Sequence, residues 1–559
     1  MQGITAFIET YATKADDLAA IDTDAAAKAN YGTIASVCHH VSRPGARNIR
    51  EAAQLFWFLH VLDETDSPGR IDQFFYPYYV MTSAAERDAE ARVVFDELWC
   101  KFINNRTWNV CLGGQTPDGG DAVNELSHIF LDLQEKYGRE APNLSVRFFR
   151  GSPDSFVTRC SEVIGKGSGQ PTMYNDEVLV PALVHLGIPI EDARNYAMNG
   201  CAQIDIQGKS HMGLEDGEVS LIKCLELALH RGKSPITGEL VGADTLPSDK
   251  IDSYVALRDQ LYAQIDHAVD LFTDTANLFQ EIQAETCPQL FRSLFVDGCI
   301  QLGLDLKRGG PRYNHGQFQT EGIANCGNAL YTIKKLVFEE GRYGLDELVD
   351  ILDADWEGDE NLHAEVKGVL PKYGNAEDDV DALTAQVLDD YFCSLSRKRT
   401  WRGGIYSGGV VVFNRAFQYG KGLAASADGR RSGEPVADSI GPTQGSDQNG
   451  PTAMLTSVAK LPFDKATCGA CLNLKLVPSL FRNEEGATAV ADLFSTYFAL
   501  GAQQLQVNVV DRKTLVKAKE NPEAAKSLVV RVGGYSDLFI NLSPEYQDDI
   551  IARTGHTIS

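Results

Sequence analysis

The stretch Val530-Arg-Val-Gly-Gly-Tyr-Ser536, close to the C-terminus, decides how the rest of this chain is interpreted. Its β-branched residues followed by two glycines predict a strand that ends in a turn with positive φ. A second short stretch, Asn199-Gly-Cys-Ala-Gln203, stands far upstream. Taken alone, each stretch is a weak signal, because a Gly-Gly turn and a lone buried cysteine are both common structural features.

The pattern around these stretches predicts an α/β fold. Apolar residues at three- and four-residue spacing predict that residues 1–135 are mostly helical and that helices dominate again over residues 217–395. Shorter runs are typical of buried strands; they span residues 144–149, 177–180, 409–413, 472–477, 504–510 and 528–532. Strands separated by long helical segments favour an α/β barrel with helices outside, built as one large domain.

Composition excludes several classes of protein. The chain has 559 residues with 23% charged and 43% hydrophobic residues, an ordinary globular balance. A net charge of −26 argues against a nucleic-acid partner. The sequence contains neither a membrane-spanning apolar stretch nor a signal peptide at its start. The 12 cysteines are scattered singly, as a reducing compartment permits, so we expect a cytoplasmic location.

Seen together, the two short stretches and several further blocks resemble the glycyl radical enzymes, the family of pyruvate formate-lyase and the radical diol dehydratases. Residues 531–536 resemble the signature of this family. The other matching blocks follow in the same order as in the family; they span residues 67–73, 112–115, 124–127, 142–147, 174–177, 427–438, 449–453, 457–460 and 548–556. The resemblance therefore covers essentially the whole chain.

This resemblance implies a ten-stranded type of α/β barrel with outer helices and with the radical-bearing loops inside. Residues 1–420 would form a pyruvate formate-lyase-like barrel domain, shortened at its N-terminus. Residues 421–559 would form a C-terminal glycine radical domain that is part of the same barrel. The resemblance also implies anaerobic metabolism, a homodimer and an activating partner, an iron–sulfur enzyme that uses S-adenosylmethionine to install the radical. It implies no bound metal or organic cofactor.

By the resemblance, Gly534 stores the radical and Cys201 becomes the thiyl radical that attacks the substrate. Glycine suits this task because a radical α-carbon is planar, and a residue without Cβ flattens at the least cost. The adjoining amide nitrogen and carbonyl delocalise the spin. The thiyl then takes hydrogen from a C–H bond of a small organic substrate. A barrel interior that brings the two loops together also excludes water and oxygen.

The residues after Cys201 depart from the family pattern. Pyruvate formate-lyase has a second cysteine where this chain has Ala202, so cleavage of pyruvate is not expected. The dehydratases and lyases have a glutamate base where this chain has Gln203, and an amide can orient a substrate but does not accept a proton at neutral pH. Glu215 is the leading replacement base. The other nearby titratable groups are Asp205, His211 and Asp216, each with a structural role as an alternative.

These departures leave three functions open. The first is a lyase or dehydratase that cleaves a C–O, C–N, C–S or C–C bond. The second is radical addition to an alkene such as fumarate, as in the alkylsuccinate and benzylsuccinate synthases of the family. The third is an inactive shortened relative with a binding or subunit role. Two further predictions are that the lone Cys468-Gly-Ala-Cys471 motif binds no metal and that Arg147 binds an anionic substrate or satisfies a buried carboxylate.

Overall fold

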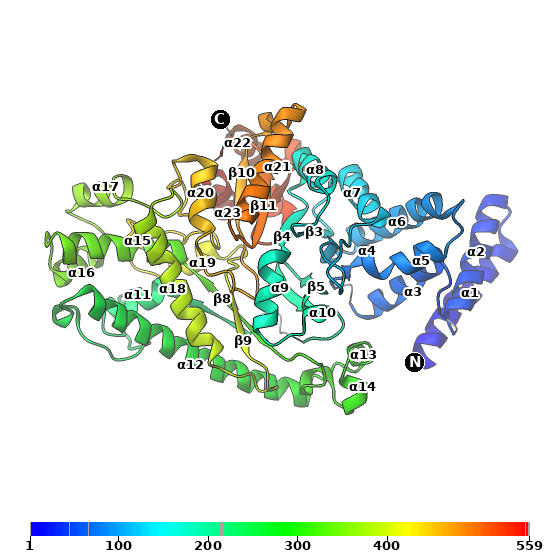
Figure 1. Cartoon of the computed structure of the whole chain (residues 1–559), viewed down its shortest axis with the longest axis horizontal. Helices are drawn as coiled ribbons and strands as arrows, with labels where there is room; N and C mark the ends of the chain where they lie inside the picture. Colours follow the sequence, from blue (N-terminus) through cyan, green and yellow to red (C-terminus); the bar gives the residue numbers. More distant parts are fainter. Residues whose placement is uncertain (1, 44, 65, 212–215, 554, 557–559) are drawn as a thin grey trace.

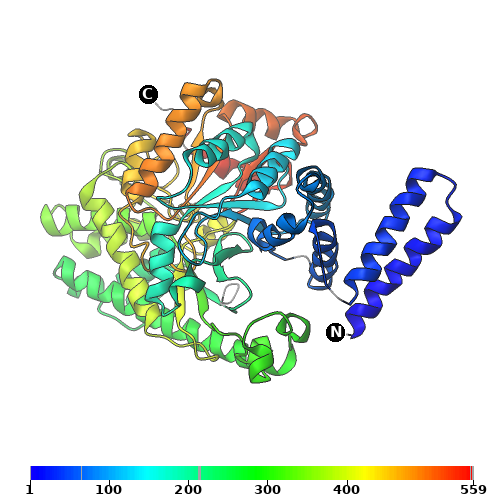
Figure 2. The same cartoon turned by 45° about the vertical axis from the view of Figure 1, so that its right-hand side comes forward.

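The computed structural model describes residues 2–43, 45–64, 66–211, 216–553 and 555–556. Helices wrap the outside of a curved β wall, and the helical pair α1 and α2 projects from one side of the body (Figures 1 and 2). The α/β class predicted from the sequence is confirmed. The helices are α1 (Gln2–Ile21), α2 (Ala25–Val41), α3 (Ile49–Leu62), α4 (Ile71–Phe74), α5 (Tyr76–Met81), α6 (Arg87–Asn104), α7 (Glu125–Tyr137), α8 (Asp154–Val163), α9 (Asp176–His185), α10 (Ile190–Ala193), α11 (Leu221–Leu229), α12 (Tyr254–Thr286), α13 (Leu290–Ser293), α14 (Cys299–Leu302), α15 (Ile323–Ile333), α16 (Leu345–Asp353), α17 (Glu360–Gly368), α18 (Asp378–Ser396), α19 (Ala416–Lys421), α20 (Gly450–Val458), α21 (Glu484–Ala499), α22 (Arg512–Glu520) and α23 (Pro544–Ala552).

Two sheets form the β wall. A six-stranded sheet has the order β1-β2-β3-β4-β11-β10, and a three-stranded parallel sheet has the order β7-β8-β9. In the larger sheet β1 to β4 run parallel, whereas β11 pairs with β4 in the antiparallel direction. A bridge between Val410 and Ala470 links the two sheets. These strands are β1 (Gly69–Arg70), β2 (Asn109–Gly113), β3 (Asn143–Phe148), β4 (Thr172–Asn175), β7 (Gly217–Ser220), β8 (Gly316–Glu321), β9 (Tyr406–Gly409), β10 (Asn473–Leu476) and β11 (Gln504–Val509).

Two short hairpins carry the sequence motifs into the space between the sheets. Strands β5 (Tyr196–Asn199) and β6 (Gln203–Ile206) pair in the antiparallel direction, so that Cys201 lies at the turn. Asn109 of β2 donates to the Cys201 carbonyl from one side (3.3 Å), and Gln317 of β8 donates to the Ile204 carbonyl from the other (2.8 Å). The second hairpin pairs β12 (Val529–Arg531) with β13 (Ser536–Leu538), and its turn contains the Gly-Gly pair.

Two of the predicted strands were wrong. Residues 177–180 lie in helix α9, because the side chain of Asn175 accepts a hydrogen bond from the Glu177 amide and begins a helix at that point. Strand β9 ends at Gly409, and the apolar run after it turns away at Phe413, whose φ is 56°. Residues 410–412 are fully buried without being a strand. Val410 makes a single bridge, to Ala470, but the strand does not continue through residues 411–412, so the β-branched side chains there reflect burial.

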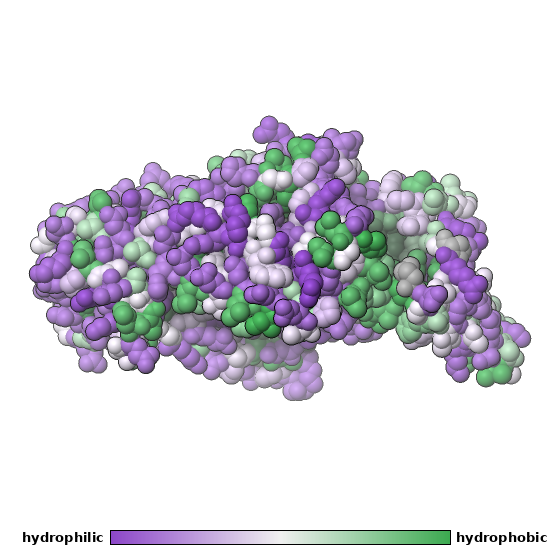
Figure 3. All heavy atoms as spheres, turned by 90° about the horizontal axis from the view of Figure 1, so that it is seen from below, coloured by the Kyte–Doolittle hydropathy of each residue, from purple (hydrophilic) through white to green (hydrophobic). Residues whose placement is uncertain are grey.

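The surface is mainly polar. The face shown in Figure 3 is largely hydrophilic, with separate apolar clusters between charged regions. Some of the exposed apolar side chains lie on and between α13 and α14, including Leu290, Phe295 and Leu302. No helix in the described ranges is long and apolar enough to cross a membrane.

Candidate active site

Cys201 and Gly534 lie in direct contact inside the molecule. A Cβ atom built on Gly534 would stand 2.8 Å from the Cβ of Cys201, and its three nearest neighbours all belong to Cys201 or Ala202. Gly534 has a φ of 88°, a conformation that side-chain-bearing residues rarely adopt. The Cys201 side chain is buried. The two residues that the sequence singled out are therefore brought together by the fold.

One amide side chain holds both residues. Asn143 of β3 donates from its Nδ2 to the Cys201 carbonyl (3.0 Å) and to the Gly534 carbonyl (2.9 Å). Arg531 donates to the Gly534 carbonyl as well (2.8 Å) and to Oδ1 of Asn143 (2.6 Å). Two donors on one carbonyl increase its pull on electron density. They therefore favour the delocalised spin that a Gly534 radical requires.

Arg531 is a buried cation among neutral partners. No carboxylate among the described residues pairs with its guanidinium, and burial lowers the pKa of Arg531 to about 10. Besides Asn143 and Gly534, the partners of its guanidinium are the side chains of Gln506 (2.6 Å), Thr172 and Ser536 (3.2 Å). Burying an unpaired charge is expensive, so its retention at this position points to a task at the Gly534 carbonyl. Sequence reasoning missed this role of Arg531 and missed Asn143 entirely, although both lie inside the quoted blocks.

The surroundings of the pair are apolar and closely packed. Gly533 is needed here because a Cβ at that position would lie 2.3 Å from the Phe413 carbonyl. Cys471, the second cysteine of the Cys-Gly-Ala-Cys motif, is a free thiol whose pKa is raised well above its usual range by burial. Such a wall keeps water away from a radical. Buried members of the apolar cluster include Cys111, Tyr174, Met198, Cys201, Ala202, Ile204, Val411 and Cys471.

Of the two roles predicted for Arg147, satisfying a buried carboxylate is the one that the structure bears out, and its complete burial contradicts contact with a substrate. Its guanidinium is fully buried and donates twice to Asp176, from Nε to Oδ1 (2.9 Å) and from Nη2 to Oδ2 (2.8 Å). The remaining donors reach the carbonyls of Tyr196 (2.7 Å) and Arg194 (2.9 Å). Arg147 thus satisfies a buried carboxylate and fixes strand β5 against β3. Its partner comes from a helix that the sequence predicted as a strand.

We expect Arg147→Met to destabilise the fold strongly. The change would leave the Asp176 carboxylate buried without its cation, which costs about 3–5 kcal/mol. Urea denaturation followed by circular dichroism measures the loss. A double variant that also carries Asp176→Leu removes the orphaned charge, so we expect it to recover a large part of the stability. Equal instability of the single and double variants would contradict this account.

A polar cavity of about 400 Å³ adjoins the Cys201 hairpin. Its wall includes Asn199, two residues before Cys201, and Ser67, whose Oγ accepts a hydrogen bond from the Gly200 amide (2.9 Å). Burial raises the pKa of the Asp205 carboxyl to about 7 and holds the pKa of His211 well below its usual value. His211 is therefore neutral. The ionisable lining groups are Asp63, Glu64, Asp66, Asp205, His211, Arg292 and Lys307.

Gln203 and Asp216, two other predicted site residues, do not line this cavity. Gln203 is buried in β6, and its Oε1 accepts a hydrogen bond from the Ala202 amide (3.3 Å). Asp216 is held by Gln280 (2.8 Å) and by the Gln317 amide (2.8 Å), which is a structural arrangement at the start of β7. Glu215, the leading replacement base, lies outside the described residues.

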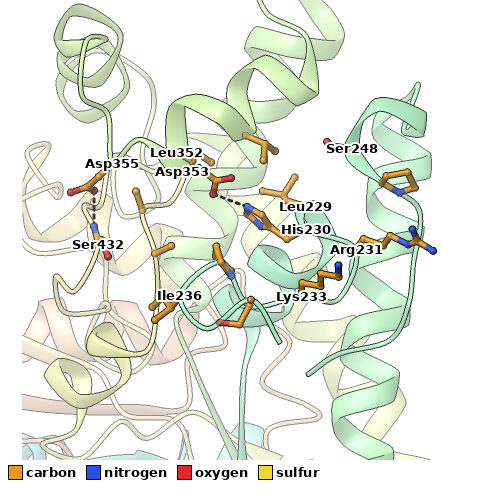
Figure 4. Close-up of a pocket in the computed structure, with 17 residues that line it drawn as sticks. Leu229, His230, Arg231, Lys233, Ile236, Ser248, Leu352, Asp353, Asp355 and Ser432 are labelled. Atoms are coloured by element: carbon orange, nitrogen blue, oxygen red, sulfur yellow. Dashed lines mark hydrogen bonds and ion pairs between the residues drawn. The ribbon is translucent and has the colours of Figure 1, made fainter. Parts of the chain in front are cut away.

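A larger hollow, of about 730 Å³, lies away from the radical residues (Figure 4). Several of its charged groups are paired: His230 bonds Asp353 (2.9 Å), and Asp355 accepts a hydrogen bond from the Ser432 amide (2.8 Å). It contains no residue of the Cys201 or Gly534 loops. The smaller cavity, in contrast, is lined by Ala197, Met198, Asn199 and Asp205 of the β5–β6 hairpin, although neither Cys201 nor Gly534 itself lines it.

The fold and the paired cysteine and glycine define a class of enzyme that stores a radical on its own backbone. Residues 1–420 match the family described as pyruvate formate lyase-like, and residues 436–540 match the glycine radical family. The chain belongs to the glycyl radical enzymes of the pyruvate formate lyase-like family.

The relatives found by comparison are dehydratases and lyases. Trans-4-hydroxy-L-proline dehydratase of Clostridioides difficile is 34% identical over 98% of this chain and 72% of its own length. (2S)-3-sulfopropanediol dehydratase of Klebsiella oxytoca is 30% identical over 98% of this chain and 70% of its own length. The glycerol-bound structure of the B12-independent glycerol dehydratase of Clostridium butyricum superposes with a TM-score of 0.94 at 34% identity, covering 99% of this chain and 73% of that one.

The Asn143 bridge gives a first test of the site. We expect Asn143→Ala to lower turnover about 100-fold, because the cysteine and glycine lose their shared donor and small misplacements cost this much. The radical signal should also decay faster, since the Gly534 carbonyl keeps only the Arg531 donor. Spin quantification over time, beside a turnover assay, measures both effects. Unchanged radical lifetime and rate would contradict the assigned role.

Proposed function

We propose that this protein is a glycyl radical lyase or dehydratase that acts on a small organic substrate, with Gly534 as the radical store and Cys201 as the attacking thiyl. The observation that carries the proposal is the single Asn143 amide bound to the carbonyls of both residues. It supports a permanent, close contact in which a hydrogen atom can pass from the Cys201 sulfur to the Gly534 α-carbon. Contact between the two argues against an inactive binding protein.

The reaction follows from this contact. The Gly534 radical takes the hydrogen atom of the Cys201 thiol, which restores a glycine C–H bond and leaves a thiyl. The thiyl takes hydrogen from a substrate C–H bond. The carbon radical then loses a leaving group, with its bonding electron pair, from the neighbouring carbon as the substrate gives up a proton, and the product radical recovers hydrogen from the Cys201 thiol. The thiyl formed in this way takes hydrogen from Gly534, so the radical returns to the glycine and the cycle ends as it began.

The cavity limits the substrate to a small polar molecule. Its volume of about 400 Å³ and its lining of carboxylates, Arg292 and Lys307 suit a compound with several hydrogen-bonding groups. The relatives named as dehydratases and as isethionate sulfite-lyase support elimination over addition to an alkene. The proposal includes a separate activating enzyme, a homodimer and a cytoplasmic location.

Anaerobic incubation with a glycyl radical activating enzyme, S-adenosylmethionine and a reductant tests the function. We expect a doublet in the electron paramagnetic resonance spectrum, split by the one remaining Gly534 hydrogen. Exposure of the activated protein to air should then cut the chain at Gly534, which mass spectrometry detects. A competent activating enzyme that produces neither the doublet nor the cut would show that the chain does not carry the radical.

A further inference from the structure

The proposed elimination needs a proton acceptor that the residues beside Cys201 do not supply. The carbon radical expels its neighbour readily only when the hydroxyl on the radical carbon gives up its proton. Ala202 has no acceptor, and the Gln203 amide does not take a proton at neutral pH. Within the described part of the chain, the wall of the cavity beside the hairpin supplies carboxylates that can accept a proton.

Among the described carboxylates of that wall, only one is both shielded from solvent and free of an ion pair. Asp63 and Asp66 both pair with Arg292, at 3.1 Å and 3.5 Å. Glu64 is exposed to solvent. Asp205 is partly buried, and its partners among the described residues are neutral groups: the Asn199 amide side chain (3.3 Å), the Ile206 amide (2.9 Å) and the Ser210 hydroxyl.

The backbone places Asp205 on the same rigid hairpin as Cys201. It lies in β6 opposite Ala197 of β5, and both residues line the cavity. Because side chains alternate along a strand, Asp205 shares its face with Gln203, about 7 Å further from the Cys201 turn. A small substrate spans such a distance. The hydrogen bonds from Asn199 and Ile206 hold the carboxylate in place while lone pairs stay available to the cavity.

We propose that Asp205 is the catalytic proton acceptor of this site, for a substrate whose hydroxyl is on the carbon from which Cys201 takes hydrogen. This assignment rests on the proposed function. Asp205 takes the hydroxyl proton as the leaving group departs with its bonding electron pair. The carbon radical becomes an α-carbonyl radical, which recovers hydrogen from the Cys201 thiol. Asp205 returns its proton to the leaving group, so a vicinal diol yields one carbonyl compound and one water.

The pKa of the Asp205 carboxyl suits both the acceptance of the hydroxyl proton and its return to the leaving group. Burial raises its pKa to about 7, so the carboxyl accepts and returns a proton near neutral pH. Below this value it is protonated and does not accept, so kcat should fall as the pH drops through about 7. The charged and titratable groups that face it across the cavity are Asp63, Glu64 and Asp66 beside α3, Arg292 of α13, and His211 and Lys307.

The test compares Asp205→Asn, Asp205→Glu and Glu239→Gln, a matched loss of charge at an exposed carboxylate outside the cavity. Each full-length protein is activated anaerobically and offered three probes that carry a hydroxyl next to a leaving group: glycerol, propane-1,2-diol and isethionate. We expect Asp205→Asn to keep the full doublet while kcat falls about 10²–10⁴-fold. The fall of kcat below about pH 7 should also disappear. Asp205→Glu should recover part of the rate, and Glu239→Gln should match the wild type.

The outcomes separate this inference from the proposed function. One outcome overturns the role of Asp205 and leaves the proposed function intact. In it, Asp205→Asn gives the full radical yield, turns over within about threefold of the wild type and shows the same fall of kcat at low pH. If the wild type forms no doublet, the proposed function itself fails. If it forms the doublet but consumes none of the three probes, the assigned substrate class fails, and with it the role of Asp205.

A measurement without substrate checks the ionisation independently. A buried carboxyl whose folded pKa is raised binds its proton more tightly when folded, so its stabilising contribution is lost as the pH rises through about 7. The Tm of the wild type should therefore fall more between pH 6 and 8 than the Tm of Asp205→Asn. Parallel Tm profiles would show that Asp205 is not protonated near neutrality.

Discussion

Gly534→Ala is expected to abolish both the organic radical and turnover, while the folded protein remains. The added Cβ would lie 2.8 Å from the Cβ of Cys201, at a φ of 88° that alanine rarely adopts. A planar radical carbon with a methyl group has no room in this contact. Spin quantification after activation should give no doublet, and product formation should fall below detection.

Gly187→Ala is the matched control for this variant. Gly187 has the same φ of 88°, but a Cβ there meets nothing within 4 Å. Both variants therefore carry the same backbone strain, and only Gly534→Ala also crowds the cysteine. We expect Gly187→Ala to keep its radical and its rate at a small cost in Tm. A doublet of normal size in Gly534→Ala would show that another residue stores the radical.

Secondary structure was predictable where burial and backbone pairing agree. The runs at 144–149 and 504–510 are strands β3 and β11, shifted by at most one residue. The run at 177–180 misled the prediction because helix α9 carries apolar residues on its exposed face as well, such as Val184, and these hide the helical period of its buried face. Only the cap formed by Asn175 distinguishes it. The strands of the smaller sheet, β7 and β8, lie within a region predicted to be helical and are only four and six residues long.

The site was predictable only in its reactive residues. Cys201 and Gly534 stand in motifs, whereas Asn143 acts through contacts that span 58 and 391 positions of sequence. Partners so far apart in sequence are identified only in the folded structure. The role of Arg147 stayed open for the same reason, because the carboxylate that neutralises it lies 29 positions away on an unpredicted helix. Asp205 was one of several candidates until the cavity distinguished it.

Cys201→Ala is expected to separate storage of the radical from its use. The variant keeps the backbone hydrogen bonds of the Cys201 carbonyl, since Asn143 and Asn109 both bind main-chain oxygen. Activation should therefore still produce the Gly534 doublet at close to wild-type yield. Turnover should be lost completely, because no sulfur remains to pass the hydrogen atom. Product analysis and spin quantification on the same sample measure the two effects.

Deuterium identifies the sulfur that exchanges hydrogen with Gly534. In heavy water the thiol carries deuterium, so the doublet of wild-type protein should collapse as the Gly534 hydrogen is replaced, whereas the doublet of Cys201→Ala should persist. Cys471→Ala is the control, since this thiol lies in the same apolar cluster but is not among the nearest neighbours of a Gly534 Cβ. Its doublet should collapse like the wild type. Collapse in Cys201→Ala and persistence in Cys471→Ala would reverse the assignment.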